Sequence, residues 1–422
     1  MRKILVALIA LCAVFMYSCE KSVNMNDPKV LAAWGDRPDA SGTPVAAYLQ
    51  VLTDAFSQAN AEDSIAWISS HRETGIPLLE RVRAAVAENQ APDVVQTQGG
   101  ILLAPFVESE RILDLTEELS DIKTCEAAKN VMRWNDKIDG VAPLYSIAGL
   151  FVNETKFKEL GLPIPKTIAQ LETAAEALKN KGIIPFAADT ADKRSLSYMY
   201  MYLVNRMGGD IFQQVLNRKI RFDSPIFVKA GLKIQEWANK GYFGAVPLTG
   251  NATDLMSTGQ AGMQVSGTWL CGTYSDSTKT KGTIGFYPFP ILTGGKGAVT
   301  DILGASEVAF VGVTKPSVKR ELVDKFMHEA MSAEVLKKAT GMLSSDPSYP
   351  PSDPLLGMAA QVFYKAKNLQ FYWEKELPTT TTGPAVATTV QSFLLPDTDV
   401  QAACTKLEQT TQVEMGGVVE DW

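Results

Sequence analysis

Side chains that can contact a ligand follow several of the strands that the sequence predicts. Trp34 and Asp36 come at the end of the first apolar run, and Gln96 and Gln98 follow the third. In an open α/β sheet, ligands gather at the carboxyl ends of the strands, so these positions are candidates for a binding site. The same rule selects two further positions, Asp189 and Trp269.

The residues that most enzymes use for catalysis are sparse in this chain. His71 and His328 are its two histidines, and neither has a second ligand at the spacing of a metal site. The sequence contains no G-x-S-x-G elbow and no phosphate-binding G-x-x-x-x-G-K-[ST] loop. Glu117 and Glu118 lie in a polar run that indicates a solvated helix face. We therefore expect no enzymatic activity, no metal and no cofactor.

The apolar residues alternate between the periods of strands and helices. Strands are predicted over 30–34, 65–68, 92–95 and 183–187, and helices over 45–60, 77–88, 166–181, 195–207 and 227–240. Such alternation indicates an α/β fold with parallel-rich sheets flanked by helices. Because 422 residues are too many for one core, we expect two lobes with a cleft between them.

Composition and charge narrow the class of protein. Hydrophobic residues make up 46% of the chain and charged residues 21%, as in ordinary soluble globular proteins. The net charge of −7 argues against a nucleic-acid partner, because nucleic-acid binders gather basic patches. Cys125, Cys271 and Cys404 are widely spaced and odd in number, so we expect buried thiols and no disulfide framework.

The N-terminal residues have the pattern of an export signal. Arg2 and Lys3 precede an apolar run over 4–15 that is too short to span a bilayer. Met16 to Cys19 resembles a bacterial lipobox, although Tyr17 is bulky where that pattern prefers a small residue. We expect a signal peptide over 1–18, lipidation of Cys19, a tether over 19–28, and an exported lipoprotein on a bacterial membrane, facing the periplasm or the cell surface. The alternative is plain secretion with cleavage nearby.

Four blocks of sequence resemble one known family. Residues 92–99 (PDVVQTQG) match its strand and ligand loop, and 151–157 (FVNETKF) match a "YNKDLF"-like segment. Residues 161–167 (GLPIPKT) match its helix entry, and 259–269 (GQAGMQVSGTW) its "G-x-A-A-M-x-x-x-G-x-W" signature. Together, in this order, the blocks resemble the bacterial extracellular solute-binding proteins of family 1, from about Trp34 to the C-terminus.

The resemblance implies a two-lobed periplasmic-binding-protein fold of type II, in which the chain crosses a hinge three times. The crossings are expected near Ser146, near Pro288 and around Ala333 to Thr340. Lobe 1 would then comprise 29–146 and 288–336, and lobe 2 would comprise 147–287 and 337–422. The family implies a monomeric receptor that closes on a monosaccharide or oligosaccharide and delivers it to a membrane ABC permease.

A sugar has C–H groups on its faces and hydroxyls on its edge, so its receptor needs aromatic rings and planar polar side chains. We expect Trp269 to be the aromatic ring that stacks on the sugar; the alternative is a core position between helix and sheet. Gly267 is expected to turn the backbone sharply, and Thr268 to cap the helix that follows.

The predicted contacts on lobe 1 and the hinge each have a packing alternative. Trp34 and Asp36 either contact the ligand or form a packed rim. Gln96 and Gln98 can both donate to and accept from hydroxyls, but we expect one of them to point elsewhere. Tyr145 lies either in the cleft or in the packing of the hinge.

Lobe 2 and the returning segments supply the remaining candidates. Asp189 follows a strand and can accept from two hydroxyls. Asp301 and Glu307 flank a strand predicted over 308–313, and we expect one of them to line the cleft. Trp373 is our choice among the three aromatic residues at 371–373. The Met/Tyr stripe at 198–202 has helical spacing and is expected in the core.

Two other functions fit the same sequence. The cargo could be a glycerol-phosphate or a peptide-like solute, for which His71 and Arg72 form the basic pair that we place near the cleft. The protein could also be a surface or sensor lipoprotein without a role in transport.

Overall fold

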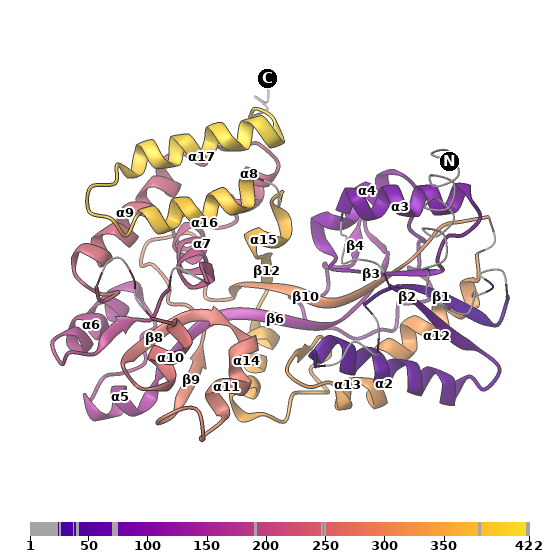
Figure 1. Cartoon of the computed structure of the whole chain (residues 1–422), viewed down its shortest axis with the longest axis horizontal. Coiled ribbons are helices and arrows are strands. Elements are labelled where there is room, and N and C mark those ends of the chain that lie inside the picture. Colours follow the sequence, from indigo (N-terminus) through magenta and orange to yellow (C-terminus); the bar gives the residue numbers. More distant parts are fainter. Residues whose placement is uncertain are drawn as a thin grey trace, which may run out of the picture.

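The computed structural model describes residues 24, 27–36, 38, 42–69, 75–189, 192–245, 248, 250–316, 318–378 and 381–418. Two α/β bodies lie side by side and are joined by long strands, as Figure 1 shows. The predicted lipidation site Cys19 and the pair His71 and Arg72 lie outside the described residues.

Lobe 1, on the right in Figure 1, contains the first three strands. The strand β1 (Val30–Gly35) pairs in parallel with β2 (Ser64–Ser69) and with β3 (Val94–Thr97). Its helices are α2 (Pro44–Ala59), α3 (Gly75–Ala87), α4 (Ala104–Glu108), α12 (Arg320–Ala330) and α13 (Ala333–Lys338). Its smaller elements are η1 (Gly100–Leu103), β4 (Arg133–Trp134) and β5 (Lys137–Ile138).

Lobe 2, on the left, is built around β7 (Ile184–Phe186), β8 (Ala261–Gly267), β9 (Ile284–Tyr287) and β12 (Asn368–Phe371). Its longer helices are α6 (Ile168–Lys179), α7 (Arg194–Gly208), α9 (Pro225–Asn239), α14 (Pro354–Lys365), α16 (Thr382–Ser392) and α17 (Val400–Met415). Its short helices are α5 (Glu154–Glu159), α8 (Ile211–Leu216), α10 (Ala252–Ser257), η2 (Thr268–Leu270), α11 (Cys271–Ser275) and α15 (Trp373–Glu376).

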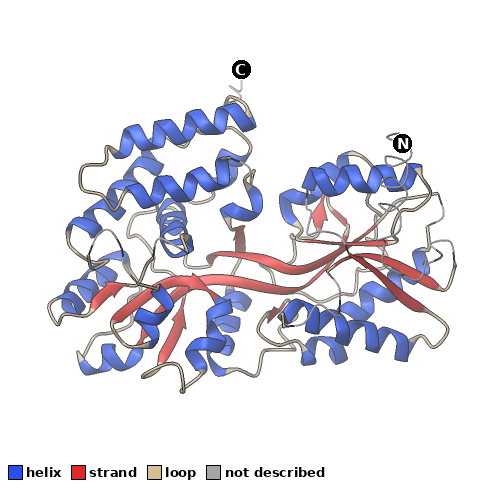
Figure 2. Ribbon diagram, in the orientation of Figure 1, coloured by secondary structure: helices blue, strands red, loops and turns tan. Residues whose placement is uncertain are grey.

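Two long antiparallel strands connect the lobes. The strand β6 (Gly140–Asn153) pairs with β10 (Asp301–Gly312) from Leu303 opposite Ala148 to Val311 opposite Gly140. Both strands run through the two bodies in Figure 2, where helices surround the shared sheet. The pairing shifts register between Ser306 and Val308, close to the middle of the molecule, so the ladder is irregular where the lobes meet.

The sheet is mixed and continuous across both lobes. Its strands are ordered β2-β1-β3-β10-β6-β8-β7, and β11 (Leu343–Ser344) pairs with β6. The outer pairs are parallel, as the alternation of strands and helices predicts. In the middle of the sheet, β10 runs antiparallel to β3 and β6, and β6 runs antiparallel to β8, while β12 joins β10 in parallel. The α/β prediction is confirmed, with one sheet shared by two lobes.

The second and third hinge crossings differ in position from those expected. Phe289 and Leu292 pack in the core of lobe 2, and Arg206 on α7 donates to the carbonyl oxygens of Phe289 and Pro290. The chain therefore enters lobe 1 within β10 and not near Pro288. Helix α13 packs on α2 of lobe 1, so the return to lobe 2 follows residue 340.

The core confirms two expectations about packing. Tyr200 and Tyr202 of α7 are 1% exposed, and the Tyr202 hydroxyl donates to the carbonyl oxygen of Ala148 on β6. The three thiols of the described chain, Cys125, Cys271 and Cys404, are free and buried. Within the described residues, no helix is both long and apolar enough to span a membrane.

Candidate functional site

A cavity of about 350 Å³ lies where the two lobes meet the hinge strands. Lobe 1 contributes the start of α2, and the hinge contributes Ser146 of β6 and Glu307 of β10. Lobe 2 contributes the first turns of α7, the tryptophan of η2 and the segment that enters α15. The lining residues are Pro44, Val45, Ser146, Arg194, Tyr198, Trp269, Glu307, Gly341, Met342, Tyr372, Glu374 and Lys375.

Trp269 is the most exposed aromatic side chain in this cavity. Its indole is 37% exposed, and it meets the rings of Tyr198 and Tyr372 edge to face at 6.2 and 6.0 Å between centroids. The rings of Tyr198 and Tyr372 are stacked at 4.6 Å. Trp269 is therefore not a core residue: three aromatic rings form one wall of the cavity and leave the indole accessible to solvent.

The residues that precede Trp269 act differently from our expectation. Gly267 has an ordinary extended backbone, with φ −93° and ψ 162°. A Cβ atom at Gly267 would lie 2.0 Å from Cζ3 of Trp269, so glycine is needed to leave room for the indole. The Thr268 hydroxyl does not cap the helix; it accepts from the backbone N–H of Ile147 on β6 and ties the turn to the hinge strand.

Two charged side chains form a second wall. The guanidinium of Arg194 lies over the indole of Trp269, with 5.5 Å from Cζ to the ring centroid. Glu374 accepts a hydrogen bond from the Tyr198 hydroxyl and lies 3.6 Å from Nε of Arg194. Burial and the neighbouring Glu374 carboxylate raise the pKa of Tyr198 well above its ordinary value, so its hydroxyl stays a donor.

The hinge strands contribute the floor of the cavity. The Ser146 hydroxyl donates to the carboxylate of Glu307, and its oxygen lies 3.5 Å from the Tyr372 hydroxyl. Ser146 and Tyr372 are buried, while Glu307 is half-buried. Burial raises the pKa of Tyr372 well above its ordinary value. The cavity therefore combines aromatic faces with carboxylate, hydroxyl and guanidinium groups.

The predicted polar contacts of lobe 1 lie beside this cavity but do not line it. Thr97, the last residue of β3, pairs with Ala309 of β10, so Gln96 and Gln98 lie on either side of the end of this strand, next to the hinge. Both glutamines are half-buried, and Thr97 between them is buried. The amide oxygen of Gln96 accepts from the backbone N–H of Asp36, 2.8 Å away.

Two predicted aromatic contacts are packed instead. Trp34 is 8% exposed, and the guanidinium of Arg81 lies over its ring at 5.0 Å. Tyr145 is 0% exposed and contacts the ring of Phe363 on α14, with 5.0 Å between centroids. These two residues therefore belong to the rim and to the hinge packing, the alternatives that the sequence left open.

Two further candidates hold the backbone and a neighbouring side chain in place. Asp189 is 4% exposed and accepts from the backbone N–H groups of Asp192 and Ala252. Asp301 is the first residue of β10, and its carboxylate accepts from Ala298 N and from Asn368 Nδ2. Neither lines the cavity between the lobes.

Among the three consecutive aromatic residues at 371–373, Tyr372 lines the cavity, and the predicted Trp373 does not. Trp373 is 2% exposed and stacks on Phe212 inside lobe 2, at 5.2 Å between ring centroids. Phe371 packs close to Gly100 of lobe 1. A Cβ atom added at Gly100 would lie 2.8 Å from the ring of Phe371. Tyr372, between them, lines the cavity. The chain changes direction between β12 and α15, so the side chains of these three residues pack in three different places.

Several lining residues were not among the candidates. Tyr198 belongs to the Met/Tyr stripe assigned to the core, and the sequence holds no signal that the first turn of α7 borders a cavity. Ser146 lies at the expected first hinge crossing, so its position in the sequence could have identified it as a residue that lines the cavity. Arg194 and Glu374 are far apart in the sequence and meet only in the folded chain.

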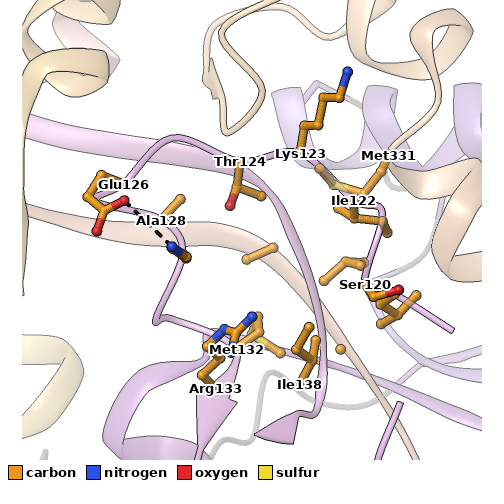
Figure 3. A pocket seen from close by; sticks show the side chains of 15 residues that line it. Ser120, Ile122, Lys123, Thr124, Glu126, Ala128, Met132, Arg133, Ile138 and Met331 are labelled. Carbon is orange, nitrogen blue, oxygen red and sulfur yellow. Dashed lines mark ion pairs between the residues drawn. The ribbon is translucent and has the colours of Figure 1, made fainter. Parts of the chain in front are cut away.

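A separate cavity of about 300 Å³ lies within lobe 1 and is shown in Figure 3. Its lining shares no residue with the cavity between the lobes. Lys123, Lys129 and Arg133 contribute positive charge, and Lys129 pairs with Glu126 at 3.9 Å. Across the described part of the chain, no group of three or more His, Cys, Asp or Glu side chains is placed to hold a metal ion.

Comparison with known proteins places this architecture in a family. The model of the bacterial extracellular solute-binding proteins matches residues 39–337. A multiple sugar-binding protein of Streptococcus mutans is 25% identical over 228 residues, which are 50% of this chain and 51% of that protein. An uncharacterised ABC transporter extracellular-binding protein of Pyrococcus horikoshii is 24% identical over 234 residues, 52% of each chain. The chain thus spans about half the length of the curated relatives that it matches.

Solved structures share the whole fold. The solute receptor AcbH, described as having an exclusive preference for β-D-galactopyranose, superimposes with a TM-score of 0.77 at 15% identity. That match covers 91% of this chain and 99% of the receptor. A probable secreted solute-binding lipoprotein of Streptomyces coelicolor gives 0.75 at 16% identity over 91% and 99%. The protein RafE in complex with raffinose gives 0.64 at 19% identity over 90% and 98%.

Proposed function

This chain belongs to the bacterial extracellular solute-binding proteins, and from that premise we propose that it captures a monosaccharide or oligosaccharide for an ABC importer. The family expected from the sequence is confirmed by the match over residues 39–337, and that family is one of binding proteins. The observation that supports a sugar as cargo is the cavity at the hinge, where an accessible indole adjoins hydroxyl, carboxylate and guanidinium groups.

The cavity matches the chemistry of a pyranose. The apolar C–H face of a sugar ring would stack on the indole of Trp269, which Tyr198 and Tyr372 hold from the side. Glu307 and Glu374 would accept from sugar hydroxyls, and Arg194 would donate to them. A hydroxyl of the wrong epimer would leave one of these groups unpaired, at a cost of about 1–3 kcal/mol.

Closure of the lobes would complete the site. The strands β6 and β10 pass between the lobes, and bending at the irregular register near Ser306 would move lobe 1 toward Trp269. Asp36, Gln96 and Gln98 lie at the strand ends beside this hinge, so they would reach the second edge of the ligand. Excluding water would strengthen each polar contact with the sugar.

Export and attachment complete the proposal. The apolar run over 4–15 would direct export, and Cys19 would carry the lipid that holds the monomeric receptor at a bacterial membrane. The residues that follow it would then act as a tether, leaving the lobes free to deliver the sugar to the permease. Relatives with sugar ligands in their names support this proposal, among them the multiple sugar-binding protein and the raffinose complex.

Ligand-dependent thermal unfolding tests the proposal. Purified protein is heated with galactose, glucose, xylose, N-acetylglucosamine, their disaccharides and raffinose, and in parallel with glycerol phosphate, amino acids and short peptides. A sugar present at 100 times its Kd should stabilise the protein by about 2.7 kcal/mol and raise its Tm. A rise in Tm with glycerol phosphate or a peptide, and with no saccharide, would overturn the proposal. The Trp269→Ala variant serves as the matched control, since the same concentration of sugar should raise its Tm by less than that of the wild type.

A further inference from the structure

A larger cavity, of about 540 Å³, lies next to the one at the hinge, entirely within lobe 2. It is bordered by the first turn of α7, the start of α15 and one side of α16. The two cavities share the side chains of Arg194 and Glu374 as lining residues. The pair therefore forms a partition between two adjoining spaces.

This partition is held by loose contacts. Arg194 lies 3.6 Å from Glu374 and 3.6 Å from Asp192, beyond normal hydrogen-bond distance in both cases. Its side chain is 52% exposed and that of Glu374 is 41% exposed. Exposed ion pairs contribute little to stability, so a ligand can move the guanidinium aside at small cost. Tyr198 holds Glu374 in place by a hydrogen bond. Arg194 is therefore the member of the pair that a ligand can displace more easily.

The lining of the larger cavity has groups that suit a carbohydrate. Trp373 lies on it, and its buried indole N–H has no acceptor among the described residues. Asn251 uses its amide oxygen to cap α10, through the backbone N–H groups of Thr253 and Asp254, which leaves its NH₂ group as a donor. Val386 and Ala387 of α16 supply apolar surface on another side.

Size also favours a ligand that occupies both spaces. Pockets for drug-sized ligands span roughly 300–1,000 Å³, and the hinge cavity of about 350 Å³ is near the lower end of that range. The larger cavity adds about 540 Å³ directly beyond Arg194. A monosaccharide on Trp269 would leave this second space to water, whereas a longer saccharide would extend into it.

We propose that the binding site continues past Arg194 into the cavity lined by Asn251, Trp373 and Ala387, and that the cargo is an oligosaccharide. One end of the saccharide lies on Trp269, and its further units lie along α16. Arg194 moves off the indole and donates to hydroxyls at the boundary between the two spaces. The inference rests on the proposed sugar-binding function and adds the size of the ligand to it.

Calorimetric titration with saccharides of graded length tests this inference. The probes are the malto- and xylo-oligosaccharides of one to four units, together with galactose, melibiose, raffinose and stachyose. Within the series that binds, Kd should fall at least tenfold between the monosaccharide and the tetrasaccharide. Equal Kd values at every length would overturn the inference and leave the proposed function in place. Absence of binding for every member would instead contradict the proposed function itself.

Two substitutions locate the gain in affinity. Ala387→Trp fills the larger cavity from α16 and should remove the gain with length, while the Kd of the shortest ligand that binds stays within threefold of wild type. Asn251→Asp keeps the oxygen that caps α10 and removes the NH₂ donor, so it should weaken the longer ligands alone. The control, Ala402→Trp, places the same side chain at an exposed position of α17, outside both cavities.

The stability of the variants is measured alongside binding. A Tm close to wild type for Ala387→Trp and Ala402→Trp shows that both proteins fold. If Ala387→Trp lowers the Tm strongly, the test of the extended site rests on Asn251→Asp alone, because this variant changes one donor and preserves the helix cap. Wild-type length dependence in Asn251→Asp together with a folded Ala387→Trp would overturn the extended site.

Discussion

The guanidinium of Arg194 lies over the indole of Trp269, with 5.5 Å from Cζ to the ring centroid. A cation over an exposed aromatic ring contributes about 0.5–1 kcal/mol, so the contact positions both side chains without fixing them. Any ligand that stacks on this face must displace the guanidinium. The same pair therefore defines the aromatic surface for the sugar and the partition in front of the second cavity.

Removal of the indole should remove most of the ligand affinity. We expect Trp269→Ala to weaken saccharide binding by at least tenfold, which corresponds to about 1.4 kcal/mol, and Trp269→Phe to weaken it less. The physical reason is the loss of the exposed face between Tyr198 and Tyr372. Titration calorimetry measures both values. Trp134→Ala in lobe 1, a half-exposed tryptophan outside the cavity, should bind as wild type; equal affinity in Trp269→Ala would contradict the assignment.

The two glycines that flank this turn allow a matched test of its geometry. A Cβ atom at Gly267 would lie 2.0 Å from the indole of Trp269, whereas one at Gly272 would meet nothing within 4 Å. Gly267→Ala should therefore push the ring out of position and weaken saccharide binding by about tenfold, or about 1.4 kcal/mol. Gly272→Ala should leave affinity unchanged. Tryptophan fluorescence reports the displaced ring independently of the ligand, and an unchanged spectrum with unchanged affinity would count against this geometry.

The aspartate of the PDV block has a structural task that can be measured. Asp93 is 1% exposed, accepts from the backbone N–H of Ala32, and pairs with Lys315 at 2.6 Å and Lys319 at 3.2 Å. Asp93→Asn removes the carboxylate that pairs with the buried ammonium group of Lys315. Breaking a buried pair in this way costs about 3–5 kcal/mol, so the free energy of unfolding in urea should fall by that amount.

The control for Asp93→Asn is a substitution in an exposed ion pair of the same lobe. Glu62 pairs with Lys29, and its side chain is 79% exposed. Glu62→Gln should change the free energy of unfolding by less than about 1 kcal/mol. Similar losses in the two variants would show that the buried cluster does not hold the first strands together.

Most of the fold could be predicted because hydrophobic periodicity fixes strands and helices locally. The helix expected over 45–60 is α2 (Pro44–Ala59), and the strand expected over 65–68 is β2 (Ser64–Ser69). The strand expected over 308–313 is the second half of β10, which begins at Asp301. Its first half continues into the other lobe, and a local pattern does not show where one strand passes between two cores.

The site was predicted only in part, because local sequence patterns do not show which residues meet in the folded chain. Trp269 follows a strand and a run of small residues, so its position at the cavity was visible in the sequence. Tyr372 and Trp373 are adjacent aromatics of similar character, and only the turn into α15 decides which of them faces the cavity. Arg194 and Glu374 become neighbours through packing between α7 and α15, which no local pattern encodes.

Asp139 should make stability depend on pH in a direction opposite to that of ordinary carboxylates. Its side chain is 3% exposed, and Oδ2 has no hydrogen-bond partner among the described residues. Burial, with the neighbouring Asp114 carboxylate, raises the pKa of Asp139 to about 7. In the unfolded chain the pKa of an aspartate is about 3.9, so between these values the folded protein holds a proton that the unfolded protein has lost.

The free energy of unfolding should therefore fall through this group as the pH rises from about 4 to about 7. Each pKa unit corresponds to about 1.4 kcal/mol, so Asp139→Asn should stabilise the protein at pH 8 by up to about 4 kcal/mol and change little at pH 4. Urea unfolding at both pH values measures the difference. Asp397→Asn, an exposed carboxylate of lobe 2, is the control and should match wild type at both. Destabilisation of Asp139→Asn at pH 8 would show that the carboxylate is ionised and paired in the folded protein.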